Sequence, residues 1–191
     1  MQIKKFSILH SPFSILPRGF TLMELMITIV ILGILISLGL SSYTSVNRKN
    51  RDNRRKNNLR SIATSLEAYY NDKGKYPNNG SNGEISGCST NDNQVCVWGS
   101  AFTDSKGTVY MPKLPGDPSS TQQYYYAAVS GNTKYQMYAR LENTQDGDVP
   151  HDINNNALSY PSTDCSSIAQ QLCNYGIASS NTTPESGRTP Q

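Results

Sequence analysis

The chain has 191 residues, with 17 basic and 14 acidic side chains, and its mean hydropathy is −0.52. This length fits one folded domain with one membrane segment. The two histidines, His10 and His151, stand far apart, and no Walker, Rossmann or Ser-His-Asp pattern occurs. Composition and motifs therefore disfavour an enzyme, and we expect no catalytic residues and no cofactor.

The charges are unevenly distributed along the chain. Residues 1–19 carry Lys4, Lys5 and Arg18 and no acid, so they hold the whole formal charge of +3. Of the remaining residues, 48–60 hold seven basic side chains against Asp52, whereas 61–191 hold 7 basic and 12 acidic side chains. A basic segment followed by an acidic one is expected if the basic stalks of some subunits lie under the acidic heads of others. The alternative is a solvated helix with a basic bias.

A long apolar run follows Arg18 and Gly19. Phe20–Leu40 is almost wholly apolar and would span about 30 Å as a helix, which suits the hydrocarbon core of a bilayer. Glu24 lies inside this run, and no other residue of the run offers it a partner. Because a charge within a membrane is costly, an intramembrane carboxylate indicates a functional site.

These residues resemble the class III signal of type IV pilins and type II secretion pseudopilins. The resemblance implies cleavage by a prepilin peptidase between Gly19 and Phe20, and N-methylation of Phe20. It also implies that Glu24, the fifth residue of the product, pairs with the N-terminal amine of a neighbouring subunit during assembly. The alternative for Glu24 is a side chain that snorkels to the membrane interface.

The next segment, residues 41–72, is predicted to be a helix, which we call the stalk. No proline occurs in it, and the spacing of Leu59, Ile62, Ala63, Leu66, Tyr69 and Tyr70 predicts an amphipathic face that packs on a sheet.

The seven basic residues after the apolar run would by themselves favour a cytoplasmic head. The cysteines and the resemblance favour a head outside the cytoplasm, which we expect. Nucleic-acid binding by the basic run is disfavoured because no aromatic residues are interleaved with it.

The head is expected at residues 73–177. Strands at Tyr124–Val129 and Lys134–Leu141 flank a Ser-Gly-Asn-Thr turn, which is typical of a β-hairpin. A short strand or buried turn is expected at Val95–Phe102, and a helical turn at Ser167–Leu172. The rigid Leu114–Pro118 connection and the Tyr-rich hairpin look like the C-terminal half of major pseudopilins. Residues 178–191 lack an apolar pattern and are expected to form a flexible tail.

The four cysteines fall into two local groups, Cys88 with Cys96 and Cys165 with Cys173. An even number in a polar, loop-rich surround predicts disulfide bonds in an exported domain. A four-thiolate metal site is the alternative, but neither group has CxxC spacing and no histidine lies nearby.

A calcium site is a further candidate. Asp146, Asp148 and Asp152 are spaced as oxygen ligands for calcium, and some major pseudopilins that resemble this chain hold calcium after the hairpin. The spacing is not that of an EF-hand, so an exposed turn is the alternative.

Together, these features predict an α+β, pilin-like fold. We expect a cleaved leader at 1–19, a transmembrane helix at 20–40, the stalk, a small antiparallel sheet in the head, and the tail. The implied function is a structural subunit of a type IV pilus or secretion pseudopilus. Its expected partners are copies of itself, prepilin peptidase, the assembly machinery and membrane lipid. It would reside in the inner membrane and then in an extracellular or periplasmic filament. The alternative is a monomeric, membrane-anchored surface adhesin or receptor.

Overall fold

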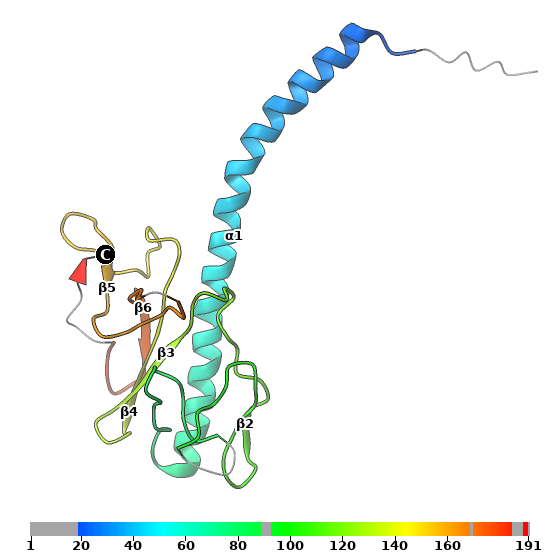
Figure 1. Cartoon of the computed structure of the whole chain (residues 1–191). Coiled ribbons are helices and arrows are strands. Elements are labelled where there is room, and N and C mark those ends of the chain that lie inside the picture. The colour runs from blue at the N-terminus through cyan, green and yellow to red at the C-terminus, as the bar shows by residue number, and fades with distance from the viewer. Residues whose placement is uncertain (1–18, 89–92, 169, 185–188, 191) are drawn as a thin grey trace, which may run out of the picture. The chain divides into compact units, whose positions relative to one another are not determined.

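The structure is a computed structural model that describes residues 19–88, 93–168, 170–184 and 189–190, without the side chains of 38–42 and 189–190. Within these residues, one long helix precedes a set of short antiparallel strands, which is the predicted α+β, pilin-like arrangement (Figure 1). The chain divides into two compact units, Met1–Tyr43 and Thr44–Gln191. Residues 1–18 of the expected leader lie outside the described part.

Helix α1 spans Leu22–Lys73. It ends where Gly74 adopts a φ of 69° and donates its N–H to Tyr70 O at 2.8 Å, a glycine-type helix stop. No helix in the described part of the chain combines the length and the apolar character needed to cross a membrane. The transmembrane segment expected at 20–40 includes residues 38–40, whose side chains lie outside the described residues.

The main sheet has the strand order β3-β4-β6, with β3 at Tyr125–Val129, β4 at Lys134–Ala139 and β6 at Tyr175–Ala178. All its pairings are antiparallel. The β3–β4 turn is the predicted one, because Ser130, Gly131 and Asn132 all have φ between 54° and 67°. Two smaller pairs are β1 (Phe102–Thr103) with β2 (Val109–Met111), and β5 (Leu158–Ser159) with β7 (Thr189–Pro190).

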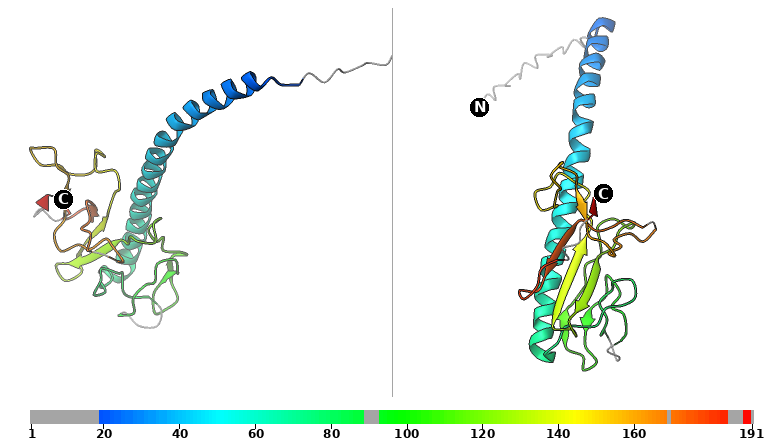
Figure 2. Two further views of the ribbon diagram at one scale, coloured as in Figure 1. Left: turned by 45° about the horizontal axis from the view of Figure 1, so that its top comes forward. Right: turned by 90° about the vertical axis from the view of Figure 1, so that its left-hand side faces the viewer.

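The core lies between the second half of α1 and the main sheet (Figure 2). Leu59, Ile62 and Leu66 are fully buried, and Tyr69 is nearly so, which confirms the predicted stripe. On β4 alternate side chains face the helix: Tyr135, Met137 and Ala139 join this core, together with Leu141 just beyond the strand. The helix is therefore held to the sheet by the apolar face that its 3.6-residue period creates.

The opposite face of the sheet is covered as well. Tyr138 is buried in a second cluster with Tyr160, Cys165 and Cys173. The loop closed by the second disulfide thus packs on the outer face of β4.

Two local expectations need correction. Ser167 and Ile168 form a bend, and Leu172 pairs with Asp164 in an isolated bridge, so the described part of Ser167–Leu172 is not helical. At Val95–Phe102, Val95 forms a bridge with Ser86, and Phe102 begins β1 after an intervening turn.

The expected tail also belongs partly to the head. Ala178 ends β6, and Ser179 is buried and donates its N–H to Tyr135 O at 3.1 Å. Backbone pairing, which leaves no apolar pattern in the sequence, holds this part of the chain in place.

Candidate functional site

The residues at the expected cleavage site precede α1. Gly19 and Phe20 are exposed and non-helical, and the Phe20 side chain is 87% exposed. Among the described residues, no atom lies within 4 Å of a Cβ atom built on Gly19. The described part of the fold therefore does not require a glycine at this position.

Thr21 and Glu24 cap the start of the helix. The Thr21 N–H donates to Glu24 Oε2 at 3.3 Å, and the Glu24 N–H donates to Thr21 Oγ1 at 3.2 Å. This reciprocal pair is a capping box, which satisfies N–H groups that the first helical turn leaves free. The expectation that its own segment offers Glu24 no partner is therefore wrong, because Thr21 supplies a backbone N–H and a hydroxyl.

The first turns of α1 expose apolar side chains on every side. Ile27, Val30 and Ile36 are each at least 50% exposed, and Met23, Met26, Ile27, Val30 and Ile31 line a shallow apolar groove of 320 Å³. Such a continuous apolar surface exceeds what a single soluble protein ordinarily leaves uncovered, and it indicates an interface.

In the second unit, Arg55 lies fully buried in a network of carboxylates. Its Nε and Nη2 donate to the two oxygens of Asp117, both at 2.8 Å, and its Nη1 donates to Asp52 at 2.8 Å and to Glu142 at 2.9 Å. Burial by itself would lower the pKa of Arg55, but the hydrogen bonds to Asp117, Glu142 and Asp52 raise it. A buried charge is tolerated when it is paired and fully hydrogen-bonded, as it is here.

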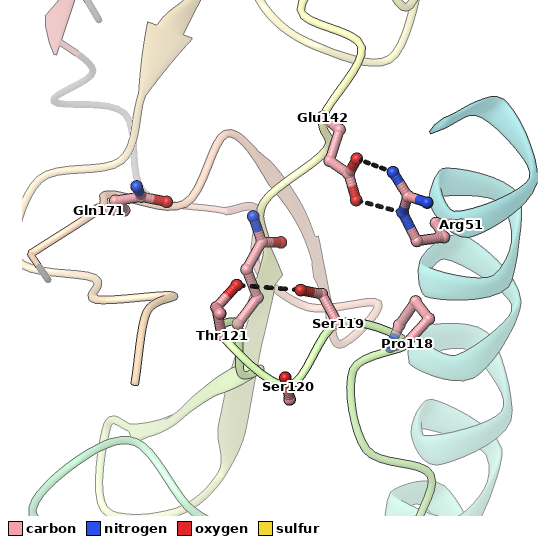
Figure 3. Close-up of a pocket in the computed structure, with 8 residues that line it drawn as sticks. Arg51, Pro118, Ser119, Ser120, Thr121, Glu142 and Gln171 are labelled. Atoms are coloured by element: carbon pink, nitrogen blue, oxygen red, sulfur yellow. Dashed lines mark hydrogen bonds and ion pairs between the residues drawn. The ribbon is translucent and has the colours of Figure 1, made fainter. Parts of the chain in front are cut away.

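Arg51 and Asp52 extend this network to the segment after β4. Arg51 pairs with Glu142 at the edge of a 560 Å³ cavity lined mainly by hydroxyl and amide side chains (Figure 3). Asp52 accepts the N–H groups of Glu142 and Asn143, each at 2.9 Å. The hydrogen bond from Arg51 and, to a smaller extent, that from Arg55 lower the pKa of Glu142 to about 2 and outweigh burial, which raises it.

Lys56 lies between Asp146 and Asp148, two of the residues proposed as calcium ligands. Its Nζ lies 2.5 Å from Asp146 Oδ1 and 2.7 Å from Asp148 Oδ2. Although burial opposes it, the hydrogen bond from Lys56 lowers the pKa of Asp146. An ammonium group thus binds two of the three proposed calcium ligands.

The third proposed ligand, Asp152, belongs to a separate turn. Its carboxylate accepts the N–H groups of Asn154 and Asn156, each at 2.8 Å. Among the described residues, no group of three or more His, Cys, Asp or Glu side chains could hold a metal ion.

These contacts change the interpretation of the basic run. Arg51, Arg55 and Lys56 bind acidic side chains of their own chain, so only the exposed Arg48, Lys49, Arg54 and Arg60 could serve the expected pairing with other subunits. Sequence reasoning missed that Arg55 points inward. The signal was present: Arg55 lies four residues before Leu59 and so shares the face of the buried stripe.

Both groups of cysteines form disulfides, Cys88–Cys96 and Cys165–Cys173. The first closes a loop beside the main core, and the second closes the loop that covers Tyr138.

The Arg55 network generates a stability prediction with a matched control. Arg55→Met should lower the free energy of unfolding by about 3–5 kcal/mol, because it leaves the buried Asp117 carboxylate without its cation. Arg54→Met, at the exposed neighbouring position, should change it by less than about 0.5 kcal/mol. Urea unfolding followed by circular dichroism measures both, and equal stabilities for the two variants would contradict the network's role.

A second prediction concerns the free energy of unfolding at acidic pH. Because the pKa of Glu142 is lowered to about 2 in the folded chain, its ionised carboxylate stabilises the fold. Its contribution to the free energy of unfolding should be complete above pH ~5 and lost as the pH falls from ~4 to ~2. The contribution should be about 1–2 kcal/mol after allowance for the exposed part of the side chain. Arg51→Gln should reduce the free energy of unfolding at pH 7 and converge with the unmodified protein near pH 2. A difference that is constant over this range would refute the assignment.

Comparison with known proteins places the N-terminal segment in context. The family model for the prokaryotic N-terminal methylation motif matches residues 17–40. The type IV major pilin protein PilA of Myxococcus xanthus (strain DK1622) is 32% identical over 59 residues, which cover 31% of this chain and 27% of that protein. The chain thus matches about a quarter of the length of this relative. No solved structure matches the chain.

The motif, the similarity to a major pilin, and a long helix followed by a small antiparallel sheet together support the assignment of this chain to a type IV pilin-like family.

Proposed function

We propose that the chain is a structural subunit of a type IV pilus or of a secretion-type pseudopilus. The observation that carries this proposal is the prepilin-type motif at residues 17–40, which coincides with the exposed apolar start of α1. An apolar surface that surrounds the helix can be buried by equivalent helices of other copies. The chain would therefore polymerise through its N-terminal segment.

Processing is the first step of this proposal. A prepilin peptidase would cleave between Gly19 and Phe20, and Phe20 would then be N-methylated. The exposure of both residues supports access by the enzyme. No described residue lies within 4 Å of the Gly19 Cβ position, which agrees with a glycine that serves recognition by the enzyme. Cleavage creates an amine at Phe20, directly before the capping box.

Glu24 would then exchange one partner for another. In the single chain its carboxylate caps the helix with Thr21, an interaction worth about 1 kcal/mol. An ammonium group about 4 Å away contributes about 4 kcal/mol at an effective dielectric constant of 20, and more where water is excluded. Desolvation of the two ions offsets part of this attraction, and on our proposal the remainder lets the N-terminal amine of a neighbouring subunit replace Thr21 as the partner of Glu24.

Before assembly, the protein would reside in a membrane. The subunit would be stored in the inner membrane with its head outside the cytoplasm, where disulfides such as Cys88–Cys96 and Cys165–Cys173 persist. The assembly machinery would then extract it into a filament.

Two substitutions separate the charge of Glu24 from its capping role. Glu24→Gln keeps a residue that can close the capping box but removes the charge, so filament yield should fall at least ~10-fold. Thr21→Ala removes the hydroxyl cap and keeps the charge, so yield should stay within about twofold. Yield is measured by shearing cells and quantifying the pelleted protein.

Cleavage provides the control, because both variants should be processed normally when whole-cell precursor and product are compared. A normal filament yield from Glu24→Gln would contradict the proposed charge pairing of Glu24. Equal losses in the two variants would instead assign the effect to the helix cap.

A further inference from the structure

The start of the stalk and the chain after β4 line a polar pocket of 180 Å³ that the proposed assembly does not use. All of its lining residues belong to the second compact unit. They are Thr44, Ser45, Arg48 and Lys49 of the stalk, and Glu142, Asn143 and Thr144 after β4. The space suits a small polar group and not a folded partner.

Arg48 and Lys49 give this pocket its positive charge. Both are exposed, and neither forms an ion pair with a residue in the described part of the chain. Their neighbours in the stalk differ, because Arg51 and Lys56 bind acidic side chains of the head. Arg48 and Lys49 are therefore available to an anion from outside the chain.

The carboxylate in the lining does not cancel this charge. Among the described residues that line the pocket, Glu142 alone is acidic. It accepts hydrogen bonds from Arg51 Nε at 2.7 Å and from Arg55 Nη1 at 2.9 Å, so its charge is already compensated. The hydroxyl and amide groups of the other lining residues add hydrogen-bond donors.

The wall formed by the chain after β4 is held in position. His151 Nε2 lies 2.8 Å from Thr144 O, and the Asp146 N–H donates to Asn143 O at 3.1 Å. Asp52 fixes the same segment through the N–H groups of Glu142 and Asn143. A site whose wall is fixed before binding loses less conformational entropy when a ligand enters.

The place of the pocket in the chain selects the source of the anion. Thr44 follows Leu40, the last residue of the apolar run, by four positions. Tyr43 and Val46 are 68% and 54% exposed. Tyrosine and long cationic side chains at the end of an apolar helical segment are typical of residues at the level of lipid headgroups. The anion expected at this level is the phosphate of a phospholipid.

We propose that Arg48 and Lys49, with the hydroxyl groups of this pocket, bind the phosphate of an anionic phospholipid such as phosphatidylglycerol while the subunit is stored in the membrane. Arginine and lysine donate charge-assisted hydrogen bonds to phosphate oxygens. The inference rests on the proposed storage in a membrane and names the lipid class that the stored subunit contacts. Extraction into a filament would release this lipid.

The test uses the full-length chain in micelles that contain equal amounts of phosphatidylglycerol and phosphatidylcholine, and native mass spectrometry counts the lipids that stay bound. Phosphatidylcholine carries the same phosphate with its own compensating cation, so phosphatidylglycerol should be retained about tenfold more. Replacing both cations, Arg48→Gln with Lys49→Gln, should lower this preference about tenfold.

Arg54→Gln with Arg60→Gln is the matched control, because it removes the same charge from exposed positions of the stalk that do not line the pocket. It should change the lipid preference by less than about twofold. Thermal unfolding of each variant shows that the head remains folded. Equal losses in the two double variants would overturn the proposal, as would equal retention of both lipids by the unmodified chain. Displacement of the lipid by glycerol 3-phosphate would instead assign the site to a free phosphate and would also overturn it.

Two further measurements separate this inference from the proposed function. Alkaline extraction of cell membranes shows whether the chain is stored there, and shearing measures the filament yield. A membrane-stored chain without the lipid preference contradicts the lipid site alone, whereas a chain absent from membranes contradicts the proposed storage. If Arg48→Gln with Lys49→Gln abolishes filaments and leaves the lipid preference unchanged, these cations pair with other subunits and the lipid proposal is wrong.

Discussion

The buried guanidinium of Arg55 is the interaction on which the arrangement of the second unit depends. It joins α1 to two distant segments, the loop at Asp117 and the chain after β4 at Glu142. Apolar packing of Leu59, Ile62 and Leu66 supplies most of the favourable free energy but little directional specificity. The hydrogen bonds from this planar group to Asp117 and Glu142 are directional contacts between the helix and two other segments, whereas Asp52 lies on the helix itself.

Basic residues of the stalk also pair with acidic residues of the head within one chain. The acidic side chains of the head do not form a metal site in the described residues; Lys56 lies between Asp146 and Asp148 and acts as a cation that belongs to the fold. The stalk and the head are thus complementary within one subunit. The exposed basic residues that remain, Arg54 among them, are the ones available to other molecules.

Much of this structure could be predicted from local sequence patterns. The helix, its stop at Gly74, the buried stripe and the β3–β4 hairpin follow from periodicity and turn chemistry, which involve residues close in sequence. The Arg55–Asp117 pair joins residues 62 positions apart, and no local pattern specifies such a contact. The helical turn expected at Ser167–Leu172 was wrong because the disulfide and the Asp164 hydrogen bonds determine that loop. The Thr-x-x-Glu spacing of Thr21 and Glu24 is a local signal that predicts the helix cap, so this contact too could be predicted from sequence.

The N-terminal segment joins a helix cap and an apolar surface in a few residues. Its carboxylate has a modest partner within the single chain and, on our proposal, a stronger one in the next subunit. On our proposal, the processed N-terminus therefore drives assembly. Intact-mass measurement of protein from sheared surface filaments, imaged in parallel by electron microscopy, tests it most directly. We expect helical polymers whose subunit mass begins at a methylated Phe20, whereas protein that retains residues 1–19 and forms no filaments would contradict the account.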